Sequence, residues 1–151
     1  REKQKVKRMY GLLENQFRRT FARASREKGI TGEALLVLLE RRLDNVTYRL
    51  GFASSRAEGR LLVRQGHILI NGKRVNIPSY VVRVGDEVSV KEGSRQMTRV
   101  LTAMEGAQRR GVPEWAEVNR DAFSGRIKLM PARSDITMPI NEKLIVELYS
   151  K

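Results

Sequence analysis

Three arginines spaced by four residues are the side chains of this sequence best suited to binding a ligand. Arg56, Arg60 and Arg64 would form a row on one face of a helix, because side chains four positions apart are neighbours there. A guanidinium group presents a planar fork of donors that can take two phosphate oxygens at once. The spacing therefore favours a phosphate backbone as the ligand over a small molecule.

Residues suited to catalysis are sparse. The chain has one His and no Cys, which excludes disulfides, thiolate metal sites and Cys/His pairs. Its acidic residues are scattered, and it has no Gly-rich phosphate loop of the Walker or dinucleotide type. We therefore predict no catalytic residues, no metal site, no cofactor and no small-molecule substrate. A chain without Cys is also compatible with a reducing compartment.

The positive charge of the chain is concentrated in its first half. Thirty Lys and Arg against seventeen Asp and Glu give a net charge of +13. Residues 1–28 hold ten basic and three acidic side chains, and residues 41–74 hold eight and two. Residues 75–151 are nearly balanced, with twelve and ten. Such clustering is typical of polyanion binding and exceeds what solubility requires.

Hydropathy gives no sign of a membrane segment. No apolar run approaches the roughly 20 residues that a membrane-spanning helix needs. The opening segment REKQKVKR is not followed by the apolar stretch of a signal peptide. We therefore expect a cytoplasmic protein that does not contact a membrane.

The first fifty residues are predicted to form helices. Residues 1–10 are a charged helix candidate, and residues 13–28 show an apolar stripe at helical spacing with arginines on the other face. Thr31 is expected to cap a long, continuous helix that ends at Gly51. Asp44 on this helix is expected to pair with a neighbouring arginine or to orient one, rather than to abstract protons.

A short capped helix and a hairpin follow. Ser55 and Glu58 form a capping box for the helix that carries the arginine row, and this helix is expected to end near Gln65. Asn71-Gly72 is the strongest hairpin signal of the chain. Residues 80–84 and 88–90 are further strand candidates.

The last third of the chain mixes helices and strands. Ser94 is predicted to cap a helix that buries Met97, Val100, Leu101 and Met104. Residues 115–118 and 126–130 are strand candidates. Residues 143–149 are predicted as a helix, with a strand as the alternative. The order of elements predicts an α+β fold, with helices first and then a small, mostly antiparallel sheet.

Structured RNA fits the cationic surface better than DNA or a single strand. The arginine row has no Asn or Gln to read adenine, so it favours backbone over base edges. Aromatic residues near it are few, which disfavours a stacking platform. The remaining mode is recognition of the shape of a folded RNA helix through its phosphates. If roughly six phosphates are neutralised, the logarithm of the affinity should fall with the logarithm of the salt concentration with a slope of about −5.

The segment LLERRLDNVTYRLGFASSRAEGRLLVRQGHILINGKRVNIPSYVVRVGDEVSV resembles the RNA-binding module of the bacterial small-subunit ribosomal protein S-four family. The opening REKQKVKRMYGLLENQFRRTF and the tail SDITMPINEKLIVELYSK are similar to the same family. The resemblance therefore covers essentially the whole chain. It implies a helical domain of residues 1–41, joined by residues 134–151, and an RNA-binding domain of residues 42–133 with its core at 42–90.

The resemblance also implies a function. Members of this family bind 16S ribosomal RNA early, nucleate assembly of the body of the small subunit and contribute to translational accuracy. They contact neighbouring ribosomal proteins, notably protein S-five, and some repress their own mRNA. An RNA-modifying enzyme carrying the same module, such as a pseudouridine synthase, is the alternative. It would need a separate catalytic domain, and only 61 residues follow Val90. A free RNA-binding stress factor is a third reading.

The predicted RNA contacts combine the basic blocks with positions matched to the family. They are Lys5, Arg8, Arg18, Arg19, Arg23, Arg41, Arg42, Asp44, Arg49, Ser55, Arg56, Arg60, Arg64, His67, Asn71, Lys73 and Arg74. His67 could instead have a surface or packing role. The chain departs from the family pattern at Gly59, where Ala is expected, and at Leu61, where a polar residue is common. A glycine inside a helix costs up to about 1 kcal/mol.

Overall fold

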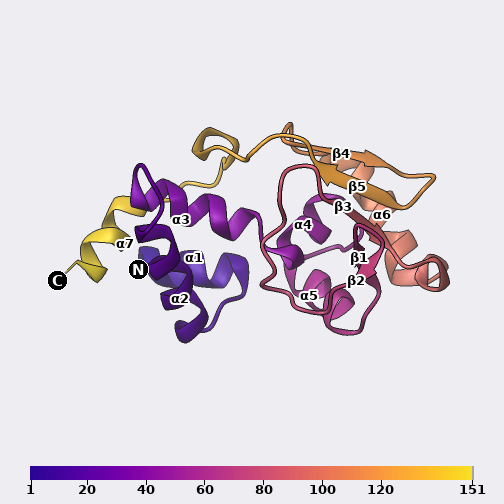
Figure 1. The fold of residues 1–151 in the computed structure, drawn as a ribbon, viewed down its shortest axis with the longest axis horizontal. Coiled ribbons are helices and arrows are strands. Elements are labelled where there is room, and N and C mark those ends of the chain that lie inside the picture. The colour runs from indigo at the N-terminus through magenta and orange to yellow at the C-terminus, as the bar shows by residue number, and fades with distance from the viewer. Residues whose placement is uncertain (151) are drawn as a thin grey trace. The chain divides into compact units, whose positions relative to one another are not determined.

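The computed structural model describes residues 1–150, and Figure 1 shows an α+β fold, as predicted. Its α-helices are α1 (Glu2–Tyr10), α2 (Glu14–Ser25), α3 (Thr31–Glu40), α4 (Leu43–Arg49), α5 (Arg56–Arg64), α6 (Thr98–Arg110) and α7 (Glu142–Tyr149). Its strands are β1 (Ile68–Ile70), β2 (Lys73–Arg74), β3 (Glu87–Val90), β4 (Ala116–Asn119) and β5 (Ser124–Ile127). The short 3₁₀ helices η1 (Glu92–Ser94) and η2 (Arg133–Asp135) complete the order.

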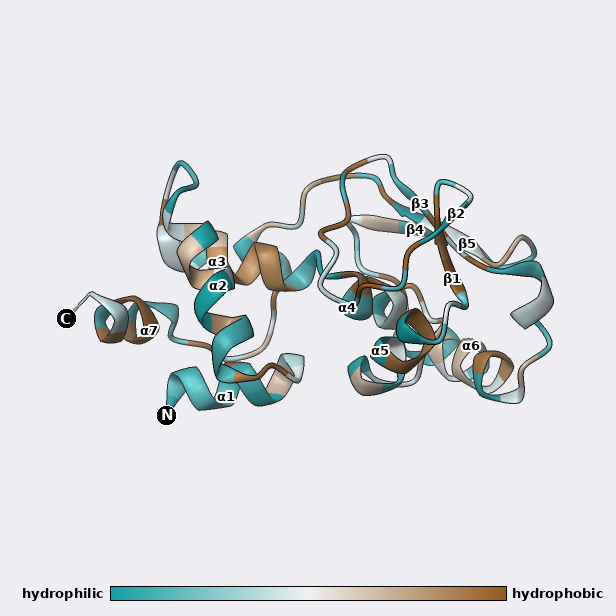
Figure 2. Ribbon diagram, turned by 60° about the horizontal axis from the view of Figure 1, so that its bottom comes forward, coloured by the Kyte–Doolittle hydropathy of each residue, from teal (hydrophilic) through white to brown (hydrophobic). Residues whose placement is uncertain are grey.

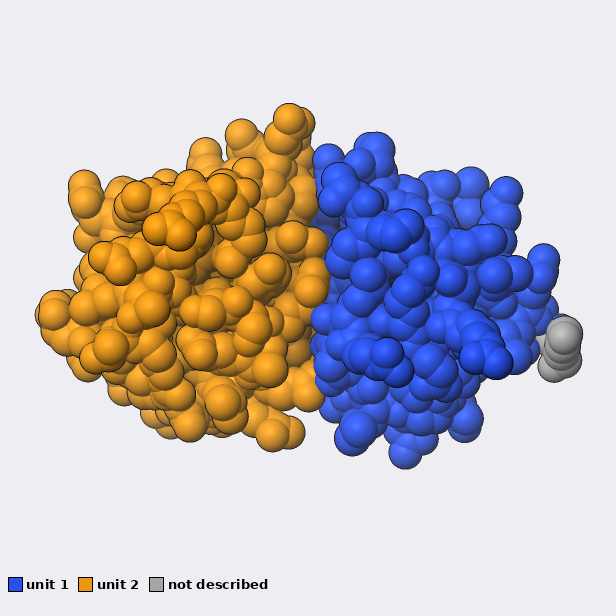
Figure 3. Space-filling model, turned by 180° about the vertical axis from the view of Figure 1, so that it is seen from behind, with its two compact units in different colours: residues 1–40, 131–151 blue, residues 41–130 orange. Residues whose placement is uncertain are grey.

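The chain divides into two compact units, coloured separately in Figure 3. The first unit contains residues 1–40 and 131–151, and the second contains residues 41–130. The sequence had placed the boundaries at 41/42 and 133/134.

The first unit is built from α1, α2, α3 and α7. Gly11 ends α1 in the left-handed conformation, with φ of 69°, where a residue without a β-carbon is favoured. Gly32 in α3 lies against Glu142, since a β-carbon there would be 2.7 Å from that side chain. Buried side chains of this unit include Val6, Tyr10, Phe17, Leu35, Leu36, Leu39 and Ile145. Residues 142–149 are a helix, so the predicted helix is confirmed over its strand alternative.

Arg133 fixes the segment that leads into α7. Its Nε donates to the Glu142 carboxylate at 2.8 Å, and its other two nitrogens donate to the carbonyls of Ile136 and Ile140 at 2.7 and 3.0 Å. One guanidinium therefore satisfies a carboxylate and two backbone acceptors. Because these acceptors converge, the planar fork of an arginine suits the position better than a lysine would.

The second unit is built on an antiparallel sheet with strand order β2-β1-β3-β5-β4. Asn71 and Gly72 join β1 to β2, and both have positive φ, 51° and 81°. That pair of angles is the two-residue turn that matches strand twist, so the predicted hairpin is confirmed. The strands are short and present alternating apolar residues to the core.

Helices α4, α5 and α6 lie on one side of these strands (Figure 2). Together they bury one apolar cluster. Its members include Leu43, Val46, Phe52, Leu62, Val63, Ile68, Val88, Val90, Val100, Trp115 and Ile127. The short helix α5 is stable in this setting because its apolar face packs onto neighbours, as its length requires. On the other faces of α5, Arg64 is exposed and Arg56 and Arg60 are partly exposed.

The long helix predicted from Thr31 to Gly51 is interrupted, so that prediction was wrong. Arg42 is extended, with φ of −60° and ψ of 141°, and separates α3 from α4. Its backbone pairs with Val81 in an isolated β-bridge, and Val82 N–H donates to the Arg41 carbonyl at 2.9 Å. These bonds come from residues about forty positions away, so tertiary pairing overrides the local helical pattern.

Two further predictions were wrong for related reasons. Residues 80–84 do not form a strand, because they pair with the break around Arg42 instead of joining the sheet. Ser94 does not cap α6, which begins at Thr98 after an extended Met97. Ser94 is instead the last residue of the 3₁₀ helix η1, and its hydroxyl hydrogen-bonds with the His67 ring. Of the residues predicted to be buried on α6, Val100 is buried but Leu101 is 41% exposed.

Candidate nucleic-acid interface

The arginine row lies on α5, as its spacing predicted. Arg64 is exposed, and Arg56 and Arg60 are partly exposed. The Ser55 hydroxyl accepts the Glu58 backbone N–H at 3.1 Å, which confirms the predicted N-cap. Oε1 of Glu58 is buried without a hydrogen-bond partner among residues 1–150. The Ser55 hydroxyl stabilises the first turn of α5.

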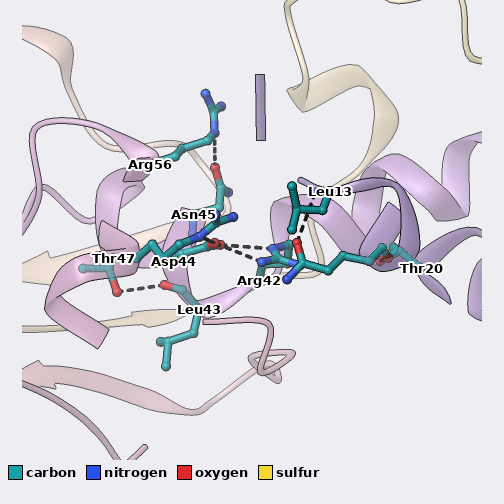
Figure 4. A network of polar contacts seen from close by, with 10 residues as sticks. Leu13, Thr20, Arg42, Leu43, Asp44, Asn45, Thr47 and Arg56 are labelled. Carbon is teal, nitrogen blue, oxygen red and sulfur yellow. Dashed lines mark hydrogen bonds and ion pairs between the residues drawn. The ribbon is translucent and has the colours of Figure 1, made fainter. Parts of the chain in front are cut away.

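A buried carboxylate lies beneath the row. Both oxygens of Asp44 bind Arg42, from Nε at 3.2 Å and from Nη2 at 3.1 Å, and Oδ1 also accepts the Asn45 N–H at 2.7 Å (Figure 4). The Arg60 Nε lies 3.6 Å from Oδ2. The Asp44 side chain is 2% exposed, and its position in the first turn of α4 suits the positive end of that helix.

Two of the predicted RNA contacts are buried in this structure. The side chains of Arg42 and Asp44 are 5% and 2% exposed. They bind each other and lie beneath Arg60, and an RNA contact by either residue stays a prediction. The prediction that Asp44 pairs with an arginine is confirmed, with Arg42 as the partner. The exposed fraction of Arg60, 25%, leaves that side chain able to reach a ligand while Asp44 orients it.

A neighbouring amide orients the first arginine of the row in the same way. The Arg56 Nε donates to Oδ1 of Asn45 at 2.6 Å (Figure 4). Within α4, the hydroxyl of Thr47 donates to the Leu43 carbonyl. Asn45 was missed from the sequence, because nothing in its spacing marks it as a partner of α5. The two helices thus position Arg56 and Arg60 through consecutive residues, Asn45 and Asp44.

The close packing of these helices depends on Gly59. A β-carbon at that position would lie 2.4 Å from the backbone oxygen of Asp44, closer than real contacts allow. The departure from the family pattern at this position therefore has a structural reason in this chain. Leu61, the other departure, is 47% exposed beside the arginines.

The hairpin carries two more of the predicted cations. Lys73 and Arg74 on β2 are both exposed. Asn71, also predicted as a contact, uses its side chain within the protein: Nδ2 donates to Asp86 at 3.0 Å, and Oδ1 accepts the Glu87 N–H at 2.8 Å. These two bonds fix the turn and so the direction of the β2 side chains.

His67 lies at the entrance to β1. Its Nδ1 is 2.7 Å from the hydroxyl of Ser94. Desolvation and the positive charges of Arg99 and Lys91 lower the pKa of the imidazole. At neutral pH the ring is therefore uncharged, so it can offer a hydrogen bond but no positive charge to a bound anion.

The remaining predicted contacts have varied surroundings. Arg41 donates from Nε to the Val82 carbonyl at 3.1 Å, and the Arg49 guanidinium lies 5.7 Å from the ring centre of Tyr48. In the first unit, Arg8, Arg19 and Arg23 are exposed, as is most of Arg18, which lies 3.3 Å from Glu14. Lys5 binds the Pro139 carbonyl at 2.7 Å and pairs with Glu2.

Among residues 1–150, no three His, Asp or Glu side chains gather closely enough to hold a metal ion. In the same range, no helix has the length and apolar content to cross a bilayer. The arginine surface over Asp44 and Asn45 presents guanidinium donors that suit phosphate oxygens.

The fold and this surface define a protein with an S4-type RNA-binding module. The family described as S4 domain matches residues 41–88, and the family described as Ribosomal protein S4/S9 N-terminal domain matches residues 1–40. Small ribosomal subunit protein uS4 of Pelobacter propionicus is 61% identical, that of Citrifermentans bemidjiense 62% and that of Geobacter sp. strain M21 61%. Each match covers all of this chain and 73% of the relative. The chain belongs to the small ribosomal subunit protein uS4 family.

Proposed function

We propose that this chain is a primary binder of 16S ribosomal RNA that nucleates assembly of the body of the small subunit. The observation that carries the proposal is the arginine surface of α5. Two of its guanidinium groups are oriented from beneath, Arg60 by Asp44 and Arg56 by Asn45. Orientation before binding reduces the entropy that a long side chain loses when it meets a phosphate. A rigid surface of this kind suits an early, independent encounter with folded RNA.

The family supports further roles. We propose that the protein contacts neighbouring subunit proteins, notably protein S-five, and through this contact contributes to translational accuracy. Exposed apolar side chains support protein contacts, with Leu144 and Leu148 on α7 at 49% and 48% exposure. Binding of its own mRNA and repression of translation would use the same arginine surface. We also propose that the protein functions in ribosomes and therefore in the cytoplasm.

An RNA-modifying enzyme is the less favoured alternative. The matched relatives are named as a ribosomal protein, and they match this chain over its whole length. The family matches cover residues 1–40 and 41–88 with a ribosomal domain and an RNA-binding domain. These matches favour a structural rather than a catalytic role.

Binding to naked rRNA tests the proposal. The protein should bind 16S rRNA without any other subunit protein, and it should bind 23S rRNA much more weakly at the same salt concentration. Filter binding over a range of KCl concentrations measures both affinities. Equal affinity for the two RNAs, or binding to 16S rRNA only after other subunit proteins have bound, would contradict primary binding.

A further inference from the structure

Three arginines from three helices surround one aromatic ring in the second unit. The guanidinium carbons of Arg110, Arg56 and Arg49 lie 4.2, 5.1 and 5.7 Å from the ring centre of Tyr48. These arginines come from the end of α6, the start of α5 and the end of α4. We propose that Tyr48 organises them into one phosphate-binding site for structured RNA. This inference rests on the proposed function and extends the RNA interface onto α6.

The position of α6 is fixed by a close backbone approach. A β-carbon on Gly51 would lie 2.7 Å from the β-carbon of Ala107, so α6 packs directly against the turn that follows α4. Gly51 has φ of 95°, a conformation that also favours glycine. One helical turn after Ala107 lies Arg110, and its Nη2 donates to the Tyr48 carbonyl at 2.7 Å. The close approach at Gly51 therefore places Arg110 over the ring of Tyr48.

The contacts at the ring orient the cations. Arg110 binds a carbonyl and the ring face, and Arg56 binds the amide of Asn45 and the same ring. The Tyr48 carbonyl is a neutral acceptor, so this contact does not offset the positive charge of Arg110. A guanidinium has five N–H donors, and the Tyr48 carbonyl takes one from Arg110. Like charges gathered at one ring repel, and an anion that binds among them relieves the repulsion.

Arg110 lies outside the part of the chain that matches the RNA-binding module. The S4 domain match ends at residue 88, whereas α6 spans Thr98–Arg110. The alternative role of Arg110 is structural, because a cation in the last turn of a helix interacts favourably with the helix dipole. Arg109 shares that turn and is also exposed. It therefore serves as a control with the same charge and the same position relative to the dipole.

The test compares Arg110→Ala with Arg109→Ala in the full chain. Affinity for 16S rRNA is measured by filter binding across KCl concentrations, and thermal melting checks the fold of each variant. Arg110→Ala should weaken binding about five- to tenfold and make the slope of log affinity against log salt shallower by about 0.9. Arg109→Ala should leave the slope unchanged.

Substitution of the ring separates organisation from charge. Tyr48→Phe keeps the ring and should bind like the parent, whereas Tyr48→Leu should lose the same affinity and slope as Arg110→Ala. Equal slopes for Arg110→Ala and Arg109→Ala would overturn the proposal. So would an Arg110→Ala effect seen with a protein-bearing subunit particle but not with naked rRNA, since the surface would then face a protein. Failure of the parent chain to bind 16S rRNA would instead overturn the proposed function.

Discussion

The backbone oxygen of Asp44 lies only 2.4 Å from the point where a β-carbon on Gly59 would be. Helix α5 therefore approaches the first turn of α4 more closely than any side chain at residue 59 allows. That approach brings Arg60, the next residue, to 3.6 Å from the Asp44 carboxylate. The absence of a β-carbon at Gly59 therefore permits the helix packing that places Arg60 beside Asp44.

Replacement of Gly59 by Ala should destabilise the protein. Helix propensity alone would favour Ala by roughly 1 kcal/mol. The clash with a backbone oxygen should reverse the sign and cost about 1–3 kcal/mol. The control is Gly106→Ala in α6, where a β-carbon meets nothing within 4 Å. Urea denaturation should show Gly59→Ala less stable and Gly106→Ala slightly more stable than the parent. A stabilising Gly59→Ala would show that the helices have room to separate.

Removal of the Asp44 carboxylate should be among the most damaging single changes in the second unit. Asp44→Ala leaves the buried Arg42 without its partner, and breaking a buried ion pair in this way costs about 3–5 kcal/mol. The free energy of unfolding in urea measures the loss. For comparison, Glu117→Ala removes a carboxylate of an exposed pair with Arg126 and should cost at most about 1 kcal/mol. Similar losses for both variants would contradict the role given to Asp44.

The cap at Ser55 gives a smaller and more local prediction. Ser55→Ala removes the acceptor of the Glu58 N–H and should destabilise the protein by about 1 kcal/mol. The neighbouring Ser54 is exposed, so Ser54→Ala is the matched control. Thermal melting of both variants would detect the difference. Identical melting of Ser55→Ala and the parent would mean that the cap contributes nothing.

Local signals in the sequence predicted the local structure well. The cap at Ser55, the hairpin turn at Asn71-Gly72 and the helix over residues 142–149 are encoded by a few adjacent residues. The arginine row was also predictable, because helical spacing alone places Arg56, Arg60 and Arg64 on one face. Such features need no knowledge of the remainder of the chain.

Features that depend on distant partners were not predictable. The break at Arg42 is caused by pairing with Val81, and the buried carboxylate of Asp44 lies against Arg60 of another helix. The link between Asn45 and Arg56, and that between Tyr48 and Arg110, join separate helices. Periodicity describes one element at a time, so it cannot report which side chains of two elements meet.

The first unit should show a specific sensitivity to acid. Glu14 binds Lys7 at 2.9 Å and Lys3 at 3.3 Å, and these hydrogen bonds lower its pKa from 4.5 to about 2. Because the pKa is lower in the folded state than in the unfolded state, the charged carboxylate stabilises the fold above pH 4.5. That stabilisation is lost as the pH falls from 4.5 towards 2.

Glu14→Gln tests this directly by thermal melting between pH 7 and pH 2. The variant should be less stable than the parent at neutral pH, and the difference should shrink through the acid interval. Glu27→Gln, at an exposed position of the same unit, controls for the loss of one negative charge. A constant difference between Glu14→Gln and the parent at every pH would exclude the ion pairs as its cause.

The salt dependence of rRNA binding tests the central claim most directly. The parent is compared with Arg56→Ala/Arg60→Ala/Arg64→Ala and with the control Arg83→Ala/Arg120→Ala/Lys128→Ala, which removes three exposed cations of the same unit. The α5 triple variant should bind 16S rRNA more weakly and flatten the slope of log affinity against log salt by about 2–3. The control should change the slope by less than about 1. Equal slopes for the α5 triple variant and the parent would contradict phosphate binding by the arginine row.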